Sequence, residues 1–348
     1  MSKIIISAAN GQDGSNMVDY LLSSTDDEVI GTIRRTSQPI LENLKEAIGH
    51  PRFRLEMMDL NDAHSIDELI AKEKPDYFIN FGASAFVPDS WNSPAACMET
   101  NAIALIHILE SVRKHNPKCR VYSAGSSEQW GDVKYSPQDE KHPMSPRSIY
   151  GVSKCAASLI CKIYRESYNL FVIHGILTNH EGLRRQYHYV SRKITSNVAR
   201  IYHKAQKDQN FEPLILGQLD AKRDWSDSRD FMRGVWSMIN QSEPNEYILS
   251  SNETHSVREF CEISFREAGF SDCWWEGEGV NEKYFWKNPQ GEKVVLVSVS
   301  EKFYRPADVM LLQGDSTLAR KNLGWIPEIT FNQMVKDMVM HDIELYKS

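Results

Sequence analysis

The chain has 348 residues, of which 41% are hydrophobic and 25% charged, as is typical of a soluble globular protein with one large α/β domain or two joined ones. The formal net charge is −7 and no basic block occurs, which argues against nucleic acid as a partner. We expect no membrane association, because apolar runs are strand-sized and no signal peptide precedes the first strand. Six scattered cysteines without metal-ligand spacing predict reduced thiols, no metal and a cytoplasmic location.

Strands and helices are expected to alternate along the first half of the chain. Strand patterns occupy residues 3–7, 28–34, 54–58, 76–81, 120–124 and 170–177, and helical patterns occupy residues 15–23, 63–72, 101–114 and about 150–168. Such alternation predicts an α/β fold with a Rossmann-like, doubly wound parallel sheet over residues 1–178.

The pattern loosens after residue 178. Helices are expected at residues 190–205, 228–241, 256–268 and 316–322, with short strands between them. We expect residues 179–348 to form a smaller C-terminal α/β domain, with some segments returning to the first domain. Because open α/β sheets bind ligands at the carboxyl ends of their strands, this region should close a substrate cleft there.

A glycine-bearing turn, Gly11-Gln12-Asp13-Gly14, joins the first strand to the first helix. Glycines at this place let the backbone approach a pyrophosphate at the helix N-terminus, so the turn predicts a dinucleotide site. Ala8 stands where the longer glycine pattern has its first glycine. Either the turn is altered or Ala8 adopts a negative φ.

Arg34 and Arg35 follow the second strand, where an acidic residue would bind a ribose 2′-hydroxyl. Two arginines suit a 2′-phosphate instead, so the pair predicts NADP; the alternative is a solvated basic turn. Four further residues follow the third and fourth strands and are expected to border the cofactor: Asp59, Leu60, Gly82 and Ala83.

Tyr150 and Lys154 lie four residues apart, on one face of a helix. The ammonium is expected to stabilise a phenolate, so that Tyr150 takes a proton from a sugar hydroxyl near neutral pH. Ser126, after the fifth strand, is expected to hold the same hydroxyl. This set predicts oxidation of an alcohol.

Glu128 adds a carboxylate that simple oxidation does not require. A C4 ketone acidifies the C5 proton of a hexose, and a carboxylate is then able to remove that proton and protonate the departing C6 hydroxyl. The prediction is a 4,6-dehydration with return of the hydride to C6. The alternative is a solvated loop carboxylate.

At these residues the chain resembles the GDP-mannose 4,6-dehydratase family of extended short-chain dehydrogenases/reductases. The resemblance runs almost end to end. Its most specific stretches are Gly175-Ile-Leu-Thr-Asn-His-Glu181 and Leu219-Asp-Ala-Lys-Arg-Asp-Trp225.

The resemblance implies a GDP-sugar substrate, with GDP-mannose first, and a homodimer or homotetramer. It implies cofactor contacts for His180 and Arg185, and an interface role for the Arg184-Arg185 segment. The substrate residues it implies are Asn179, Lys193, Arg223, Arg305 and Asp308. Trp225 is expected to be a packing residue rather than a platform for the base.

Three alternatives stay open at this point. Ala85 and Phe86 stand where the family usually has a serine and a histidine, which makes the sugar pocket more apolar and admits another GDP-sugar, such as a heptose or an N-acetylated sugar. A GDP-sugar epimerase or 4-keto reductase needs Ser126, Tyr150 and Lys154 but not Glu128. A non-catalytic NADP or nucleotide-sugar sensor is the third alternative.

Overall fold

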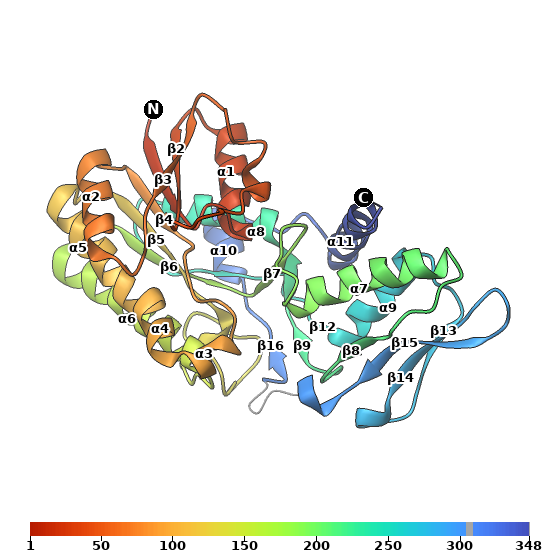
Figure 1. Cartoon of the computed structure of the whole chain (residues 1–348). Coiled ribbons are helices and arrows are strands. Elements are labelled where there is room, and N and C mark those ends of the chain that lie inside the picture. The colour runs from red at the N-terminus through yellow and green to blue at the C-terminus, as the bar shows by residue number, and fades with distance from the viewer. Residues whose placement is uncertain (304–308, 348) are drawn as a thin grey trace.

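The computed structural model describes residues 1–303 and 309–347. Its larger region is a seven-stranded sheet of order β11-β6-β5-β4-β1-β2-β3 (Figure 1). Every neighbouring pair is parallel, which confirms the predicted doubly wound parallel sheet. The strands are β1 (Lys3–Ser7), β2 (Glu28–Ile33), β3 (Phe53–Met57), β4 (Tyr77–Asn80), β5 (Arg120–Ala124), β6 (Val172–Leu177) and β11 (Ile248–Leu249).

Helices cover both faces of this sheet because successive strand residues point to opposite sides. Ile4 and Ile6 enter one core cluster and Ile5 the other, and all three are fully buried. The first cluster is covered by α1 (Gln12–Ser24), α8 (Ser228–Ile239) and α10 (Thr317–Leu323). The second is covered by α2 (Ala63–Glu73), α5 (Ala104–His115) and α6 (Ile149–Tyr168).

The chain before α5 is more helical than predicted. Three short segments precede it: α3 (Asp89–Asn92), α4 (Pro94–Met98) and a π-helical turn, η2 (Glu99–Ile103). α4, η2 and α5 run on without a break and make Pro94–His115 the one described helix long and apolar enough to span a membrane, although half of its apolar window is buried inside the protein. The expectation that apolar runs are only strand-sized is therefore wrong for this segment. Its consecutive helical parts pack against α2 and α6.

The smaller region is built on a four-stranded sheet of order β13-β14-β15-β8. Its strands are β8 (Leu214–Leu216), β13 (Cys273–Glu276), β14 (Lys283–Lys287) and β15 (Lys293–Val299), and its helices are α7 (Val190–Ala205), α9 (Val257–Glu267) and α11 (Phe331–Leu345). Trp225 is buried in this region against Phe260 and Phe331, which confirms its expected packing role. The sequence did not predict α11, which packs against α7 and α9.

Short strands join the two regions near the cleft. They are β7 (Asn179–Glu181), β9 (Lys222–Arg223), β10 (Trp225–Asp227), β12 (His255–Ser256) and β16 (Leu311–Leu312). Segments beyond residue 178 also return to the larger sheet, since β11 pairs with β6 and α8 packs against α1. The remaining short helical turns are η1 (Glu42–Leu44), η3 (Ser127–Gln129), η4 (Gly279–Asn281) and η5 (Glu301–Phe303).

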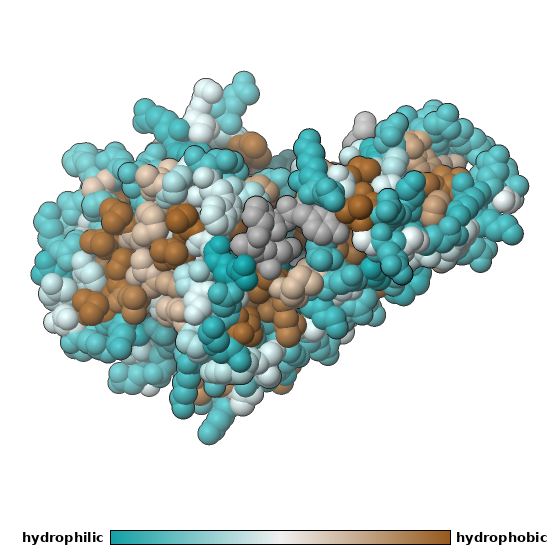
Figure 2. Space-filling model, turned by 90° about the horizontal axis from the view of Figure 1, so that it is seen from below, coloured by the Kyte–Doolittle hydropathy of each residue, from teal (hydrophilic) through white to brown (hydrophobic). Residues whose placement is uncertain are grey.

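The outer surface of α6 carries apolar side chains. Figure 2 shows apolar residues gathered on the part of the molecule where α5 and α6 lie in Figure 1. Exposed members are Ile103 beside α5 and Val152, Leu159, Ile163 and Tyr168 on α6; Leu159 is 57% exposed. A stripe of this kind along one helix is a feature of interaction surfaces.

Candidate active site

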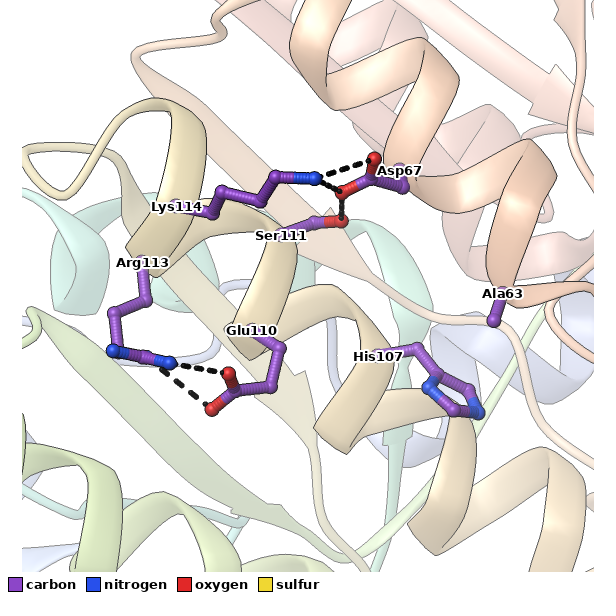
Figure 3. A pocket seen from close by; sticks show the side chains of 7 residues that line it. All are labelled: Ala63, Asp67, His107, Glu110, Ser111, Arg113 and Lys114. Atoms are coloured by element: carbon purple, nitrogen blue, oxygen red, sulfur yellow. Dashed lines mark hydrogen bonds and ion pairs between the residues drawn. The ribbon is translucent and has the colours of Figure 1, made fainter.

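One pocket of about 380 Å³ lies away from the predicted site. Figure 3 shows it lined by side chains of α2 and α5. Asp67 in its wall accepts hydrogen bonds from Ser111 and Lys114, and Glu110 pairs with Arg113. Its polar groups satisfy one another, and none belongs to the predicted catalytic set.

The predicted dinucleotide turn lies between β1 and α1. Gly11 is the N-cap of α1 and makes no side-chain cap, so the first amides of the helix are not bound by a capping side chain. A Cβ on Gly14 would lie 2.4 Å from the carbonyl oxygen of Ala8, so only glycine fits there. Ala8 has φ 51°, which shows that the alternative of a negative φ is wrong. The turn therefore keeps the left-handed shape that a glycine usually provides.

Gln12 and Asp13 join this turn to the loop after β6. Gln12 donates to the carbonyl oxygen of His180 at 3.0 Å, and the imidazole of His180 lies 2.9 Å from the carboxylate of Asp13. Burial disfavours the charged form of both side chains, but their mutual attraction and hydrogen bond outweigh the effect of burial. The pKa of Asp13 is therefore lowered and the pKa of His180 is raised. Ser228 donates to Asp13 at 3.1 Å.

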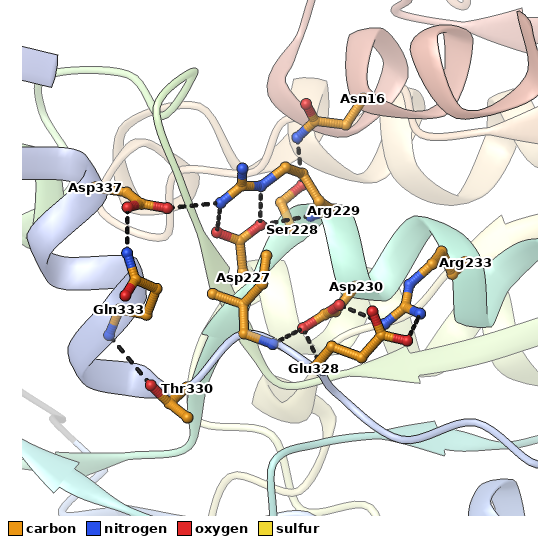
Figure 4. A network of polar contacts seen from close by, with 11 residues as sticks. Asn16, Asp227, Ser228, Arg229, Asp230, Arg233, Glu328, Thr330, Gln333 and Asp337 are labelled. Atoms are coloured by element: carbon orange, nitrogen blue, oxygen red, sulfur yellow. Dashed lines mark hydrogen bonds and ion pairs between the residues drawn. The ribbon is translucent and has the colours of Figure 1, made fainter. Parts of the chain in front are cut away.

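Ser228 belongs to a polar network at the start of α8 (Figure 4). Asn16 of α1 donates to Ser228, and Arg229 binds both Asp227 and Asp337 of α11. Asp230 accepts from the backbone of Glu328 and Ile329. This network fixes α1, α8 and α11 relative to one another beside the cofactor turn.

Ser126 begins the turn η3 at the carboxyl end of β5. Its hydroxyl accepts from the amide of Glu128 at 3.3 Å, and its own amide donates to the side chain of Gln129 at 3.0 Å. This reciprocal capping box fixes the turn that carries Glu128. Glu128 is half-buried and acts electrostatically on Tyr150.

Helix α6 brings Tyr150 and Lys154 to the same place. Ser148 caps the helix by accepting from Gly151, and Gly151 approaches the Glu128 backbone so closely that a Cβ would lie 2.6 Å from its carbonyl oxygen. Tyr150 is hydrogen-bonded to Ser126. The four predicted catalytic residues are therefore brought together.

Lys154 binds a main-chain carbonyl oxygen close to Tyr150 in this structure. The Lys154 ammonium donates to the carbonyl oxygen of Ala124 at 2.8 Å, and it lies 5.7 Å from the centre of the Tyr150 ring. Burial raises the pKa of Tyr150 above its usual value, while the Ser126 hydrogen bond opposes that rise. Burial lowers the pKa of Lys154 to about 8.

Arg185 turns inward, toward the catalytic residues. Its guanidinium pairs with the buried carboxylate of Glu181 at 2.8 Å and stacks on the ring of Tyr189 at 3.6 Å. Its charge acts on Tyr150 and Asp13. Arg184, in contrast, pairs with Asp19 of α1.

Phe86 packs against the segment that follows Arg185. Its ring meets His188 and Tyr189 edge-on, with centroid distances of 4.4 and 5.5 Å. Ala85 beside it is exposed. These contacts place the unusual Ala85-Phe86 pair next to the loop that carries Arg185.

The other predicted cofactor residues lie at the same edge of the sheet. Arg34 and Arg35 are exposed directly after β2. Gly82 donates from its amide to Ser7, and a Cβ there would lie 2.2 Å from the Leu60 side chain, so Leu60, Gly82 and the end of β1 are in contact. Asp59 and Ala83 are half-buried beside them.

The predicted substrate residues are distributed over the smaller region. Asn179 begins β7, and Arg223 is buried in β9. Lys193, on α7, places its ammonium 3.6 Å from the ring centre of Phe303, and burial lowers its pKa. Arg305 and Asp308 lie outside the described residues.

Asn101 is a site residue that the sequence analysis missed. Within η2, it accepts from the amide of Ser84 at 2.8 Å and donates to Ser153 of α6 at 2.9 Å. It thereby ties the loop after β4 to the helix of Tyr150 and Lys154. A buried asparagine inside an apolar helical run is the signal that would have shown it.

No cluster of three or more His, Cys, Asp or Glu side chains among the described residues is arranged to hold a metal ion. The site is therefore built from a glycine turn, a Tyr-Lys helix and a Ser-Glu turn on a parallel sheet. This fold and site define an extended short-chain dehydrogenase/reductase.

The chain belongs to the GDP-mannose 4,6-dehydratase family, whose profile, described as "GDP-mannose 4,6 dehydratase", matches residues 5–338. It is similar to GDP-mannose 4,6-dehydratases of Drosophila melanogaster and Vibrio cholerae, both 37% identical over 99% of this chain and covering 86% and 94% of those proteins. The human GDP-mannose 4,6 dehydratase is 36% identical, over 99% of this chain and 92% of the human protein. These findings confirm the predicted family and a dehydratase enzyme.

Solved structures show the same fold. A UDP-glucose 4-epimerase of Thermotoga maritima has a TM-score of 0.81 at 19% identity over 99% of both chains. A dTDP-glucose 4,6-dehydratase of Bacillus anthracis in complex with NAD has 0.80 at 19% identity, over 100% of this chain and 98% of that one. RMD of Pseudomonas aeruginosa, complexed with NADPH, has 0.77 at 19% identity, over 99% and 100% of the chains.

Proposed function

We propose that this protein converts GDP-mannose to a GDP-4-keto-6-deoxy sugar and uses NADP in a catalytic cycle without net consumption. The observation that carries the proposal is the convergence of Ser126, Glu128, Tyr150 and Lys154 beside the dinucleotide turn. Family membership supplies the reaction class.

The turn after β1 suits a dinucleotide. Gly11 begins the 13-residue helix α1 without a side-chain cap, and Gly14 lets that helix pack closely on the Ala8 backbone. The side-chain oxygen of buried Gln12 has no hydrogen-bond partner among the described residues. Arg34 and Arg35 are exposed, and their guanidinium groups suit a 2′-phosphate, which supports NADP over NAD.

When bound, NADP supplies a cationic hydride acceptor for the oxidation and returns the hydride at C6. Tyr150 takes the proton of the C4 hydroxyl while Ser126, which already bonds to Tyr150, orients that hydroxyl. Lys154 holds the positive charge of the site at the end of β5. Glu128 removes the C5 proton and gives a proton to the leaving C6 hydroxyl.

The sugar and nucleotide are assigned to the smaller region. Asn179 lies directly after β6, and Lys193 lies on α7. Arg223 supplies a further cation that suits phosphate oxygens. Phe86 with His188 and Tyr189 forms an aromatic wall near Tyr150. This wall favours a sugar that makes apolar contact there.

The test is the mass of the product. Purified protein with GDP-mannose and catalytic NADP should yield a product lighter by one water, without accumulation of NADPH. Glu128→Gln should abolish water loss while NADP still binds, whereas Tyr150→Phe should block the first oxidation. A product of unchanged mass would indicate an epimerase. Consumption of NADPH in a separate reaction supplied with NADPH and a GDP-4-keto sugar would indicate a reductase.

A substrate panel separates chemistry from specificity. If GDP-mannose is unchanged but another GDP-sugar loses water, the reaction stands and the substrate assignment fails. Phe86→His is the matched variant, because it restores a polar ring to the aromatic wall. NADP preference is tested by Arg34→Ala with Arg35→Ala, which should weaken NADP binding about tenfold or more while leaving NAD binding unchanged.

We propose that the protein is a homo-oligomer and that the apolar face of α6 is its subunit interface. The exposed Leu159 and Ile163 lie about three and four turns into this helix and give a second copy of the chain a matching surface. Leu159→Asp should shift the mass measured by light scattering toward the monomer. Six free cysteines support a reducing, cytoplasmic compartment.

A further inference from the structure

A buried histidine lies behind the catalytic turn. His174, in the middle of β6, is fully buried, and its neighbour across the sheet is Ser123 of β5. Its Nε2 lies 2.9 Å from the side-chain oxygen of Gln129, and its Nδ1 lies 3.3 Å from the hydroxyl of Ser123. Gln129 is also fully buried. Neither residue belongs to the predicted catalytic set.

Donors and acceptors in this contact are fixed by Ser126. The amide of Ser126 is able only to donate, and it donates to the same Gln129 oxygen at 3.0 Å. The atom of Gln129 that faces it is therefore the oxygen, which in turn requires His174 to donate from Nε2. Burial lowers the pKa of His174 to about 3, with Lys154 and Arg165 adding to the effect, so the ring is neutral and Nδ1 accepts from Ser123.

The atoms around this contact are closely packed. A Cβ on Gly125 would lie 2.6 Å from Nε2 of His174 and 3.0 Å from the Gln129 oxygen. The Gln129 carbonyl accepts from Ser145 at 3.2 Å, which fixes the other end of the residue. Gln129 is thus held through its backbone carbonyl and its side-chain oxygen, whereas its side-chain nitrogen has no hydrogen-bond partner among the described residues. The side-chain oxygen sets where the Ser126 backbone lies.

We propose that His174 and Gln129 are positioning residues: through one shared amide oxygen they fix the Ser126 turn, and with it the hydroxyl that bonds to Tyr150 and the carboxylate of Glu128. The Ser126 hydroxyl caps the amide of Glu128, so a displaced Ser126 displaces both groups. A shift of about 1 Å in reacting groups lowers rates by as much as about a hundredfold. The inference rests on the proposed dehydratase reaction for its kinetic test only.

The kinetic test uses Gln129→Leu, which keeps the volume and removes the shared acceptor. We expect kcat and the single-turnover rate of C4 oxidation to fall together by about ten- to a hundredfold. We expect KM and NADP affinity to change little, whereas the melting temperature should fall because the Ser126 amide and the His174 Nε2–H lose their shared acceptor. His174→Gln keeps a donor of similar reach and should retain most activity. Tyr122→Phe, which deletes a buried hydroxyl from β5, is the control and should match the wild type.

A second measurement does not depend on activity. Nitrogen-15 NMR of the histidines should show His174 neutral and protonated on Nε2 from about pH 5 to 8, a tautomer that Gln129→Leu no longer stabilises. A wild-type ring protonated on Nδ1, or Gln129→Leu turning over at the wild-type rate, would overturn the inference. Failure of the proposed function appears differently, as absence of product from the wild type.

Discussion

Ala8 is the residue at which the cofactor turn departs from its usual glycine, and Ala8→Gly tests what that departure costs. Ala8 has φ 51°, a conformation that disfavours any residue with a Cβ. The substitution should relieve this strain without altering the backbone, since the Ala8 carbonyl oxygen already accepts from the Gly11 amide at 2.9 Å. We therefore expect a more stable protein with an unchanged turn.

The magnitude follows from two opposing contributions. A left-handed alanine costs about 1–2 kcal/mol relative to a conformation that suits it. Glycine in the unfolded chain gains conformational freedom, which offsets about 0.4–1 kcal/mol. The net gain in the free energy of unfolding should lie between about 0 and 1.6 kcal/mol, with a midpoint of about 0.8 kcal/mol. For a chain of 348 residues this corresponds to a rise in melting temperature of only about 1 °C.

Urea denaturation, with NADP binding measured in parallel, is the assay. Ala9→Gly is the matched control, because Ala9 is fully buried and loses a packed methyl group, so it should destabilise the protein. NADP affinity of Ala8→Gly should stay within about twofold of the wild type. If Ala8→Gly destabilises the protein as much as Ala9→Gly does, the strain argument is wrong.

Three further predictions concern the contacts around the site. Gly151→Ala should lower kcat about tenfold or more while NADP still binds, because its Cβ would lie 2.6 Å from the Glu128 carbonyl oxygen; wild-type kinetics would contradict this. Arg192→Met should lower the free energy of unfolding by about 3–5 kcal/mol, because it leaves Asp342 of α11 buried without its partner, and adding Asp342→Leu should recover most of the loss in urea denaturation. The Asp13–His180 pair should make the free energy of unfolding depend on pH in both the acidic and the alkaline range. The lowered pKa of Asp13 gives stability that is present above about pH 4 and is lost as the pH falls through its folded pKa. The raised pKa of His180 gives stability that is present below about pH 6.5 and is lost as the pH rises through its folded pKa. His180→Gln should flatten the alkaline loss, and an unchanged profile would show that another group titrates there.

The sequence alone determined the sheet and the family. Apolar runs such as Ile4 to Ile6 are long enough for buried strands and too short for helices, so their alternation with helical patterns predicted the parallel sheet that the structure shows. Ser126, Glu128, Tyr150 and Lys154 were recognisable because each follows a strand or opens a helix at a fixed offset. These patterns depend on residues that are neighbours in the sequence, so they can be recognised without knowledge of the tertiary structure.

The tertiary structure decided what depends on distant partners. The sign of φ at Ala8 follows from the close packing of Gly14 on its carbonyl oxygen, which no local pattern reports. Lys154 donates to the Ala124 carbonyl oxygen because β5 ends beside α6, a contact that the four-residue spacing of Tyr150 and Lys154 does not predict. Asn101 and the His174–Gln129 contact bring together residues about 45 to 52 positions apart, and a single buried polar residue does not name its partner in the sequence. Long-range hydrogen bonds of this kind are chosen by packing, and for that reason only the folded chain revealed them.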